Sequence, residues 1–148
     1  MNTHRQAGLR RSAVLGLGLA LAFSSCSGPP PRHVDTQVGV TLKDFDVDLE
    51  ATHVPAGNVA FNIYNRGPST HEFLIVRTDL GAGSLPIGSD GLTVDENSAQ
   101  LDLVKEDSEL DIGVSRALVV DLPPGHYVFY CNLEGHYLGG MHASLVVT

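Results

Sequence analysis

The stretch VGVTLKDFDVDLE, residues 38–50, places an apolar side chain at nearly every second position. The apolar series starts at Val38 and, after a one-residue slip, continues from Phe45 to Leu49. A period of two is typical of a β-strand with one buried face, whereas an amphipathic helix repeats every 3.6 residues. The stretch therefore predicts extended chain in a sheet.

The same pattern recurs to the last residue of the chain. Short segments rich in branched and aromatic residues alternate with turn sequences that contain Gly, Pro and Asn. Six or seven short strands are typical of a β-sandwich or barrel, so residues 34–148 are predicted to form one all-β domain. The strand segments are NVAFNIYN (58–65), EFLIVR (72–77), ALVVDL (117–122), HYVFYC (126–131) and ASLVVT (143–148), and the turns are VPAGN (54–58), NRGPST (65–70) and LPPGH (122–126).

Residues 78–115 depart from this pattern. They open with a Gly-rich segment and continue as an acidic one, residues 93–113, in which Lys105 is the only basic residue. A loop of that length without structure of its own is unusual, so we expect a short helix from about Asn97 to Lys105. The acidic residues lack the spacing of a calcium loop, which favours a solvated acidic face over the alternative of a cation site.

The first 25 residues have the layout of an export signal. Arginines at positions 5, 10 and 11 precede an apolar run, residues 13–23, that is about half as long as a membrane-spanning helix requires. We therefore predict a signal peptide over residues 1–25 and export from the cytoplasm. The paired arginines also match a twin-arginine signal loosely, and either route leads out of the cytoplasm.

The residues after this signal predict a lipid anchor. Ser24 and Ser25 directly before Cys26 resemble the lipobox of bacterial lipoproteins, although Phe23 replaces the usual Leu. The resemblance implies a lipid on Cys26, with the protein anchored to the outer face of the cell membrane or held in the periplasm. The alternative is cleavage at another position. Residues 26–33, CSGPPPRH, are expected to be a Pro-rich tether.

Cysteine count and charge narrow the range of functions. If Cys26 carries lipid, Cys131 is the only free thiol and no intramolecular disulfide can form. A lone thiol in an oxidising compartment is vulnerable unless a metal binds it. The leader holds three of the 9 basic residues and none of the 17 acidic ones, so the remainder has a formal charge of −11. This charge predicts no nucleic-acid partner and favours a basic protein surface.

Metal-binding side chains are concentrated in YCNLEGHYLGGMHASLVVT, residues 130–148. One loop between the last two strands carries Cys131, His136 and Met141, with four residues between each ligand and the next. A thiolate, an imidazole and a thioether together favour copper over the hard cations. A trigonal copper site needs a second imidazole, and His71, which opens another strand, is the candidate. Each residue taken alone is more often a structural side chain, such as a buried inert cysteine or a core methionine.

The segments THEF, residues 70–73, and CNLEGHYLGGM, residues 131–141, resemble the cupredoxins, the type 1 blue copper proteins, and the loop spacing is similar to the rusticyanin-like members. The resemblance covers most of residues 34–148. It implies a Greek-key β-sandwich that holds one copper ion, which cycles between Cu(I) and Cu(II). The implied ligands are His71, Cys131 and His136 in one plane and Met141 at the axial position.

The resemblance implies a one-electron carrier and not an enzyme. Electrons would pass through His136, inside an apolar rim of Leu133, Tyr137 and Leu138, to a redox partner such as a cytochrome or a multicopper oxidase. The alternatives are a lipoprotein for copper delivery or protection, copper-dependent catalysis, and a metal-free adhesion or interaction module.

Glu72 departs from the family pattern, because many relatives have Asn or Ser after the first histidine. An inward carboxylate would lower the reduction potential or bind the copper, as in the red copper protein nitrosocyanin. The alternation of side chains along a strand predicts that the carboxylate of Glu72 points outward.

Overall fold

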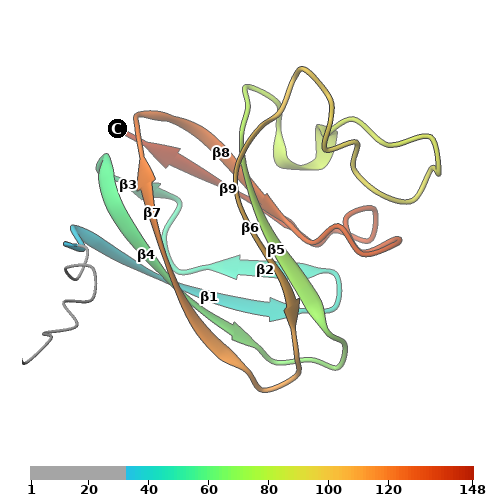
Figure 1. Cartoon of the computed structure of the whole chain (residues 1–148), viewed down its shortest axis with the longest axis horizontal. Coiled ribbons are helices and arrows are strands. Elements are labelled where there is room, and N and C mark those ends of the chain that lie inside the picture. Colours follow the sequence, from blue (N-terminus) through green and yellow to red (C-terminus); the bar gives the residue numbers. More distant parts are fainter. Residues whose placement is uncertain (1–32) are drawn as a thin grey trace, which may run out of the picture. The chain divides into compact units, whose positions relative to one another are not determined.

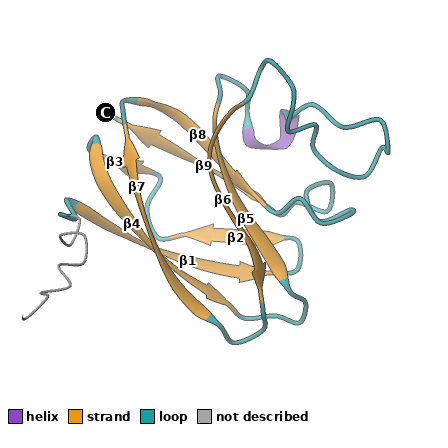
Figure 2. Ribbon diagram, viewed as in Figure 1, coloured by secondary structure: helices purple, strands orange, loops and turns teal. Residues whose placement is uncertain are grey.

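The computed structural model describes residues 33–148, which form two β-sheets around a shared core (Figures 1 and 2). The first sheet has the order β2-β1-β4-β7 and the second β3-β9-β8-β5-β6. Neighbouring strands come from distant parts of the sequence, as in Greek-key folds, and the predicted all-β sandwich is confirmed. The strands are β1 (Thr36–Lys43), β2 (Asp46–Leu49), β3 (His53–Val54), β4 (Gly57–Asn65), β5 (His71–Arg77), β6 (Asp102–Leu110), β7 (Ser115–Leu122), β8 (Gly125–Tyr130) and β9 (His142–Val147).

The predicted signal peptide, residues 1–25, lies outside the described residues, as does Cys26 with the tether up to residue 32. The export signal, the lipid on Cys26 and the domain limits therefore stay predictions. Within residues 33–148, no helix has the length and hydrophobicity needed to cross a membrane.

The core between the sheets follows from the period-two alternation. On β1, Val38, Val40 and Leu42 are buried, whereas the residues between them are partly exposed. Aromatic side chains of both sheets meet at the centre, where the ring of Phe61 on β4 lies 5.1 Å from that of Phe129 on β8. Burial of such side chains is the main favourable contribution to folding.

The central strands β5 and β8 of the second sheet are buried on both faces. Leu74 and Val76 of β5 point away from the sandwich core into a second apolar cluster. Leu85 and Val94, from residues 78–101, cover this outer face. Double burial explains why β5 and β8 are almost continuously hydrophobic and do not alternate.

The predicted helix from Asn97 to Lys105 is wrong. β6 occupies Asp102–Leu110 and pairs with β5, and the only helical element of the described residues is a 3₁₀ turn, Ala82–Ser84. Helix propensity is a weak preference, and here the hydrogen bonds to β5 outweigh it. β6 is an edge strand, and exposed charged side chains suit an edge because they discourage pairing with other chains.

The slip in the opening stretch is a hairpin turn. Lys43 of β1 pairs with Asp46 of β2, so Asp44 and Phe45 form a two-residue turn between them. Phe45 was expected to begin the second apolar series, but its side chain is 52% exposed and only Val47 of that series is fully buried. The turn places Asp44 and Phe45 beside the site described next.

Candidate metal centre

Strand pairing brings the candidate ligands to one end of the second sheet. His71 is the first residue of β5 and Cys131 directly follows β8. Because β5 and β8 are antiparallel neighbours, the start of one lies beside the end of the other. His136 lies in the loop between β8 and β9, and Met141 immediately precedes β9.

The ligand atoms of three predicted residues cluster closely. Those of His71, Cys131 and His136 lie within 4.8 Å of one another. The Sγ atom of Cys131 is 3.5 Å from Nδ1 of His136, and the two imidazole rings are 5.3 Å apart at 64°. Met141 is fully buried in the same apolar cluster as Cys131, and His136 is the one predicted ligand that is partly exposed. The structure thus brings together all four predicted residues.

Burial favours the uncharged form of both the Cys131 thiol and the His71 imidazole. Burial raises the pKa of the Cys131 thiol, while the backbone N–H groups of Glu72 and Leu133 act in the opposite direction. The N–H of Glu72 donates to Sγ at 3.3 Å. Burial lowers the pKa of His71, and the charge of His136 acts in the same direction. A metal would therefore meet a neutral imidazole and displace the proton of Cys131.

Unpartnered buried atoms test whether a metal fits. Both ring nitrogens of His71 are buried and lack a hydrogen-bond partner among the described residues. An unpaired buried polar atom costs about 1–3 kcal/mol, which a coordinate bond would offset at one nitrogen. Two imidazoles, a thiolate and a thioether form a donor set that copper prefers. The four side chains are positioned for a copper site, and residues 33–148 contain no second group of three His, Cys, Asp or Glu ligands.

The ligand loop, residues 131–141, keeps its shape through backbone hydrogen bonds of its own. The N–H of Met141 donates to the carbonyl of His136 at 3.0 Å, and that of Cys131 donates to the carbonyl of Met141 at 3.2 Å. Gly140 adopts a φ of 109°, which requires glycine. The loop is therefore ordered by contacts that do not involve a metal.

Residues 78–101 form hydrogen bonds with the ligand loop from the outer side of the sheet. The side-chain oxygen of Asn132 accepts the N–H of Val94 at 2.6 Å. The hydroxyl of Tyr137 accepts the N–H of Leu85 at 2.8 Å and donates to a carbonyl of the 3₁₀ turn at 2.8 Å. The long insertion thus stabilises the site as well as covering the sheet.

The predicted rim around His136 is partly wrong. Leu138 is exposed, but Tyr137 is only 4% exposed and belongs to the second apolar cluster, and Leu133 packs against the core. Phe45 lies edge-on to His136, with the two rings 5.7 Å apart. Sequence reasoning missed this contact, because nothing in the spacing connects the β1–β2 turn with a loop ninety residues later.

The carboxylate of Glu72 does not belong to the ligand cluster. Burial, followed by the neighbouring carboxylates of Glu106 and Glu96, raises the pKa of Glu72. Glu72 donates its backbone N–H to Cys131. This environment supports the outward orientation that the strand alternation predicts.

Comparison with known proteins identifies the family. Residues 13–147 match the family model of the cupredoxin-like domain. No curated protein sequence matches significantly. An auracyanin from Roseiflexus castenholzii is similar at 22% sequence identity and a TM-score of 0.53, and the match covers 78% of this chain and 99% of the auracyanin. A rusticyanin from Thiobacillus ferrooxidans is similar at 15% identity and a TM-score of 0.54, with 80% of this chain and 85% of the rusticyanin covered. An azurin from Methylomonas sp. strain J is similar at 16% identity and a TM-score of 0.54, with 78% of this chain and 99% of the azurin covered. At these identities the structures support the fold, and the family match covers most of the chain. This protein therefore belongs to the cupredoxin-like domain family.

Proposed function

We propose that this protein is a type 1 copper protein that carries single electrons outside the cytoplasmic membrane. The observation that carries the proposal is the arrangement of the donors: His71, Cys131 and Met141 are fully buried, and His136 alone is partly exposed. Such a site excludes water from the metal while it leaves one ligand edge near a partner.

Copper bound at these residues would supply a one-electron couple between Cu(I) and Cu(II). The β5–β8 pairing and the hydrogen bonds of the ligand loop fix the donor positions before a metal binds. A fixed donor set limits the rearrangement that accompanies a change of charge, which favours fast electron transfer. In support, a similar rusticyanin is described as a copper protein and a similar auracyanin was solved in a dithionite-reduced form.

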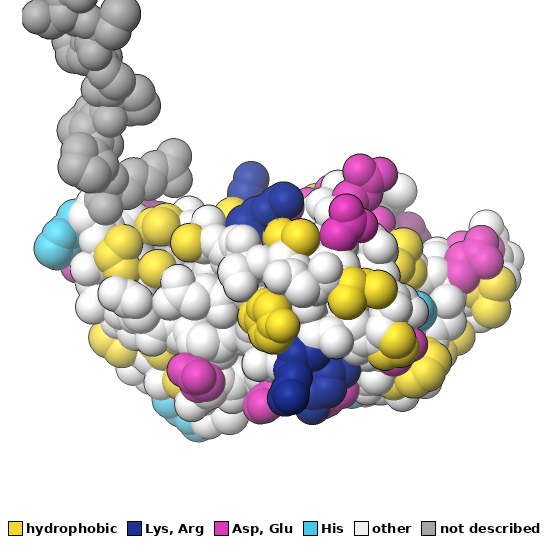
Figure 3. All heavy atoms as spheres, turned by 90° about the horizontal axis from the view of Figure 1, so that it is seen from below, with side chains coloured by type: hydrophobic (Ala, Val, Ile, Leu, Met, Phe, Trp, Pro, Cys, Tyr) yellow, Lys and Arg dark blue, Asp and Glu magenta, His cyan; other side chains and the backbone are white. Residues whose placement is uncertain are grey.

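The partner is proposed to be a basic redox protein, such as a cytochrome or a multicopper oxidase. The exposed side chains of Leu138 and Phe45 belong to the same region as His136 and would contact the partner directly. On the face drawn in Figure 3, acidic, basic and hydrophobic side chains are interspersed, without one dominant patch. The net negative charge would therefore guide approach of a partner, and apolar contact would complete docking.

Copper delivery or protection is the alternative function. A delivery protein is expected to expose exchangeable methionines and histidines, but this chain has only two methionines and Met141 is fully buried. A red copper site would need the carboxylate of Glu72 at the metal, and that carboxylate lies among other acids. The observed geometry therefore favours the carrier.

Cyclic voltammetry of the copper-loaded protein tests the carrier function. A reversible one-electron wave, with copper retained through repeated cycles in the presence of a chelator, is the result expected. Loss of copper on reduction would favour delivery. An irreversible wave would exclude a carrier.

Export and lipid anchoring are proposed from the leader sequence. If Cys26 carries lipid, Cys26→Ser should abolish incorporation of labelled fatty acid and release the protein from the membrane fraction. Fractionation of the producing bacterium, with Cys131→Ser as the matched cysteine control, would measure this. Equal membrane association of both variants would contradict the anchor.

A further inference from the structure

The two-residue turn between β1 and β2 contacts both histidine ligands. Its second residue, Phe45, has a φ of 63°, in the left-handed region that bulky residues rarely adopt. In turns where only the second central residue has positive φ, glycine or asparagine is usual. A bulky residue keeps such a strained backbone conformation only where surrounding contacts stabilise it, so the contacts of this turn indicate what holds it.

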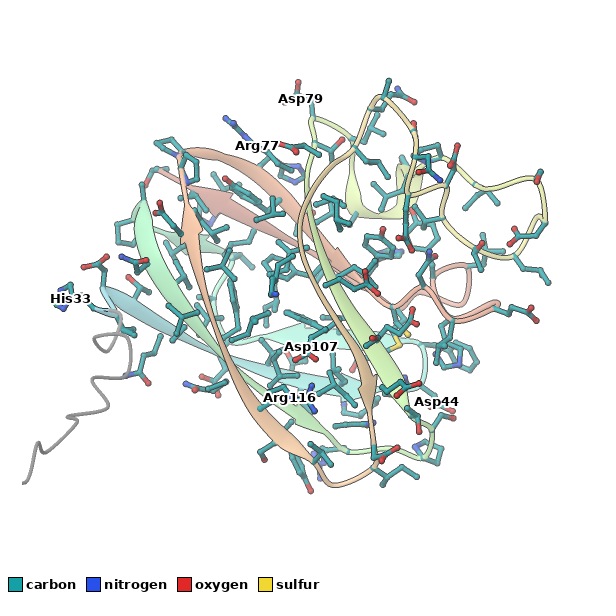
Figure 4. The ribbon with its side chains drawn as sticks, in the orientation of Figure 1. His33, Asp44, Arg77, Asp79, Asp107 and Arg116 are labelled. Atoms are coloured by element: carbon teal, nitrogen blue, oxygen red, sulfur yellow. The ribbon has the colours of Figure 1, made fainter. Side chains whose placement is uncertain are left out.

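Asp44 faces the buried histidine. Its Oδ1 atom is 3.4 Å from Nε2 of His71, and both atoms are buried without a hydrogen-bond partner among the described residues. The other carboxylate oxygen accepts the hydroxyl of Ser69 at 3.2 Å, which orients the group. Figure 4 shows Asp44 at the end of the molecule where β5 begins. A closure of about 0.5 Å would give an ordinary hydrogen bond of about 2.9 Å.

The orientation of Asp44 selects one nitrogen of His71. Because Nε2 faces a carboxylate, which can only accept a hydrogen bond, a proton on Nε2 is favoured over one on Nδ1. The other nitrogen, Nδ1, then keeps a free lone pair. A contact between Asp44 and His71 would therefore bias both the tautomer and the orientation of the ring.

Phe45 faces the partly exposed histidine. Its ring meets that of His136 edge-on, 5.7 Å away and at 65°. A Cβ placed on Gly139 would lie 2.1 Å from the ring of Phe45, so the ligand loop has room for this ring only because residue 139 is glycine. Phe45 is half exposed, so burial in the core does not account for its position.

We propose that Asp44 and Phe45 form an outer clamp that positions the two imidazole ligands. Asp44 holds His71 with Nε2 protonated and Nδ1 free for copper, and Phe45 restricts rotation of the His136 ring. Both are positioning residues, since neither would touch the metal. The inference rests on the proposed copper function, and its first test uses copper-free protein so that the two can fail separately.

The clamp has a consequence for the reduction potential. A carboxylate that accepts a hydrogen bond from a metal-bound imidazole makes the ligand more basic and favours the more highly charged metal. Loss of such a partner typically costs 10–100-fold in metal affinity. A tenfold loss of affinity for Cu(II), with the affinity for Cu(I) unchanged, would raise the reduction potential by about 59 mV for this one-electron couple.

The tautomer of His71 in the copper-free protein tests the role of Asp44. Nitrogen-15 NMR of the imidazole should show Nε2–H in the wild type and in Asp46→Asn, and mixed tautomers in Asp44→Ala. Asp46 is the matched control, because it lies in the same hairpin but pairs with Lys43 at 3.1 Å. An Nδ1–H tautomer in the wild type, or no change in Asp44→Ala, would overturn the clamp.

The reduction potential provides the second test of Asp44. Asp44→Asn keeps the size and an acceptor oxygen but removes the charge, so it should raise the potential while Asp46→Asn leaves it unchanged. Equal potentials in the two variants would refute the role of the charge. Absence of copper binding in the wild type, with the expected tautomer, would instead refute the proposed function.

Phe45→Gly tests the second half of the clamp. Glycine relieves the left-handed strain, so the thermal midpoint of the copper-free protein should not fall. NMR relaxation should nevertheless show a more mobile His136 ring. Tyr64→Leu removes another exposed aromatic, from β4, and should leave that ring as in the wild type. An equally rigid His136 ring in Phe45→Gly would overturn the proposal.

Discussion

Replacing Tyr137 by Phe should destabilise the protein while the copper site survives. The hydroxyl of Tyr137 pairs with the N–H of Leu85 and the carbonyl of Ala82, each at 2.8 Å, in a largely buried position. Phenylalanine keeps the edge-on ring contact with Tyr130 but leaves both backbone groups unpaired. At about 1–3 kcal/mol for each of the two unpaired groups, the loss should be about 2–6 kcal/mol.

Thermal unfolding of the copper-free protein, followed by circular dichroism, measures this loss. For a domain of this size the midpoint should fall by about 8–24 °C, at roughly 4 °C per kcal/mol. Tyr130→Phe is the matched control, because the hydroxyl of Tyr130 is buried without a partner among residues 33–148 and its removal should cost nothing. Equal losses in the two variants would refute the reasoning.

Three further predictions follow from buried or ionisable groups. Asn65→Ala should lower the free energy of unfolding in urea by about 2–4 kcal/mol, because the buried amide donates to the Leu110 carbonyl at 2.7 Å; a loss below about 1 kcal/mol would contradict it. Because burial raises the pKa of the Cys131 thiol, copper must displace the thiol proton when it binds. Competition titrations should therefore show that the affinity for copper falls about tenfold for each unit of pH below the pKa of this thiol. A pH-independent affinity would count against this. Because the pKa of Glu72 is raised in the folded protein, its protonated carboxyl group contributes stability below the ordinary carboxyl pKa, and this stability is lost as the pH rises through the raised pKa. Glu72→Gln should therefore unfold at a higher temperature than the wild type at pH 7 and at the same temperature near pH 4. An unchanged unfolding temperature of Glu72→Gln at pH 7 would be evidence against repulsion between Glu72 and the neighbouring carboxylates.

The sandwich and the four ligands could be predicted because they depend on local patterns. Alternation along β1 and the turn sequences indicated strands, and the spacing in the ligand loop placed Cys131, His136 and Met141 between two of them. His71 was predictable because it opens a strand after a turn. In each case the chemistry of a short segment determines the structure.

Other features depend on contacts between distant segments. β6 forms because β5 offers a free edge, which outweighs the helix propensity of residues 97–105. The burial of Tyr137 requires the cover of residues 78–101, and the contacts of Asp44 and Phe45 require a hairpin to meet the ligand loop. No short-range pattern encodes these encounters.

Addition of one equivalent of Cu(II) to the purified copper-free protein tests the copper site most directly. Coordination by the Cys131 thiolate predicts an intense visible thiolate-to-copper band that saturates at one copper per chain. The band should disappear in Cys131→Ala and weaken in His71→Ala. A colourless product, or a band of full strength in Cys131→Ala, would contradict the site.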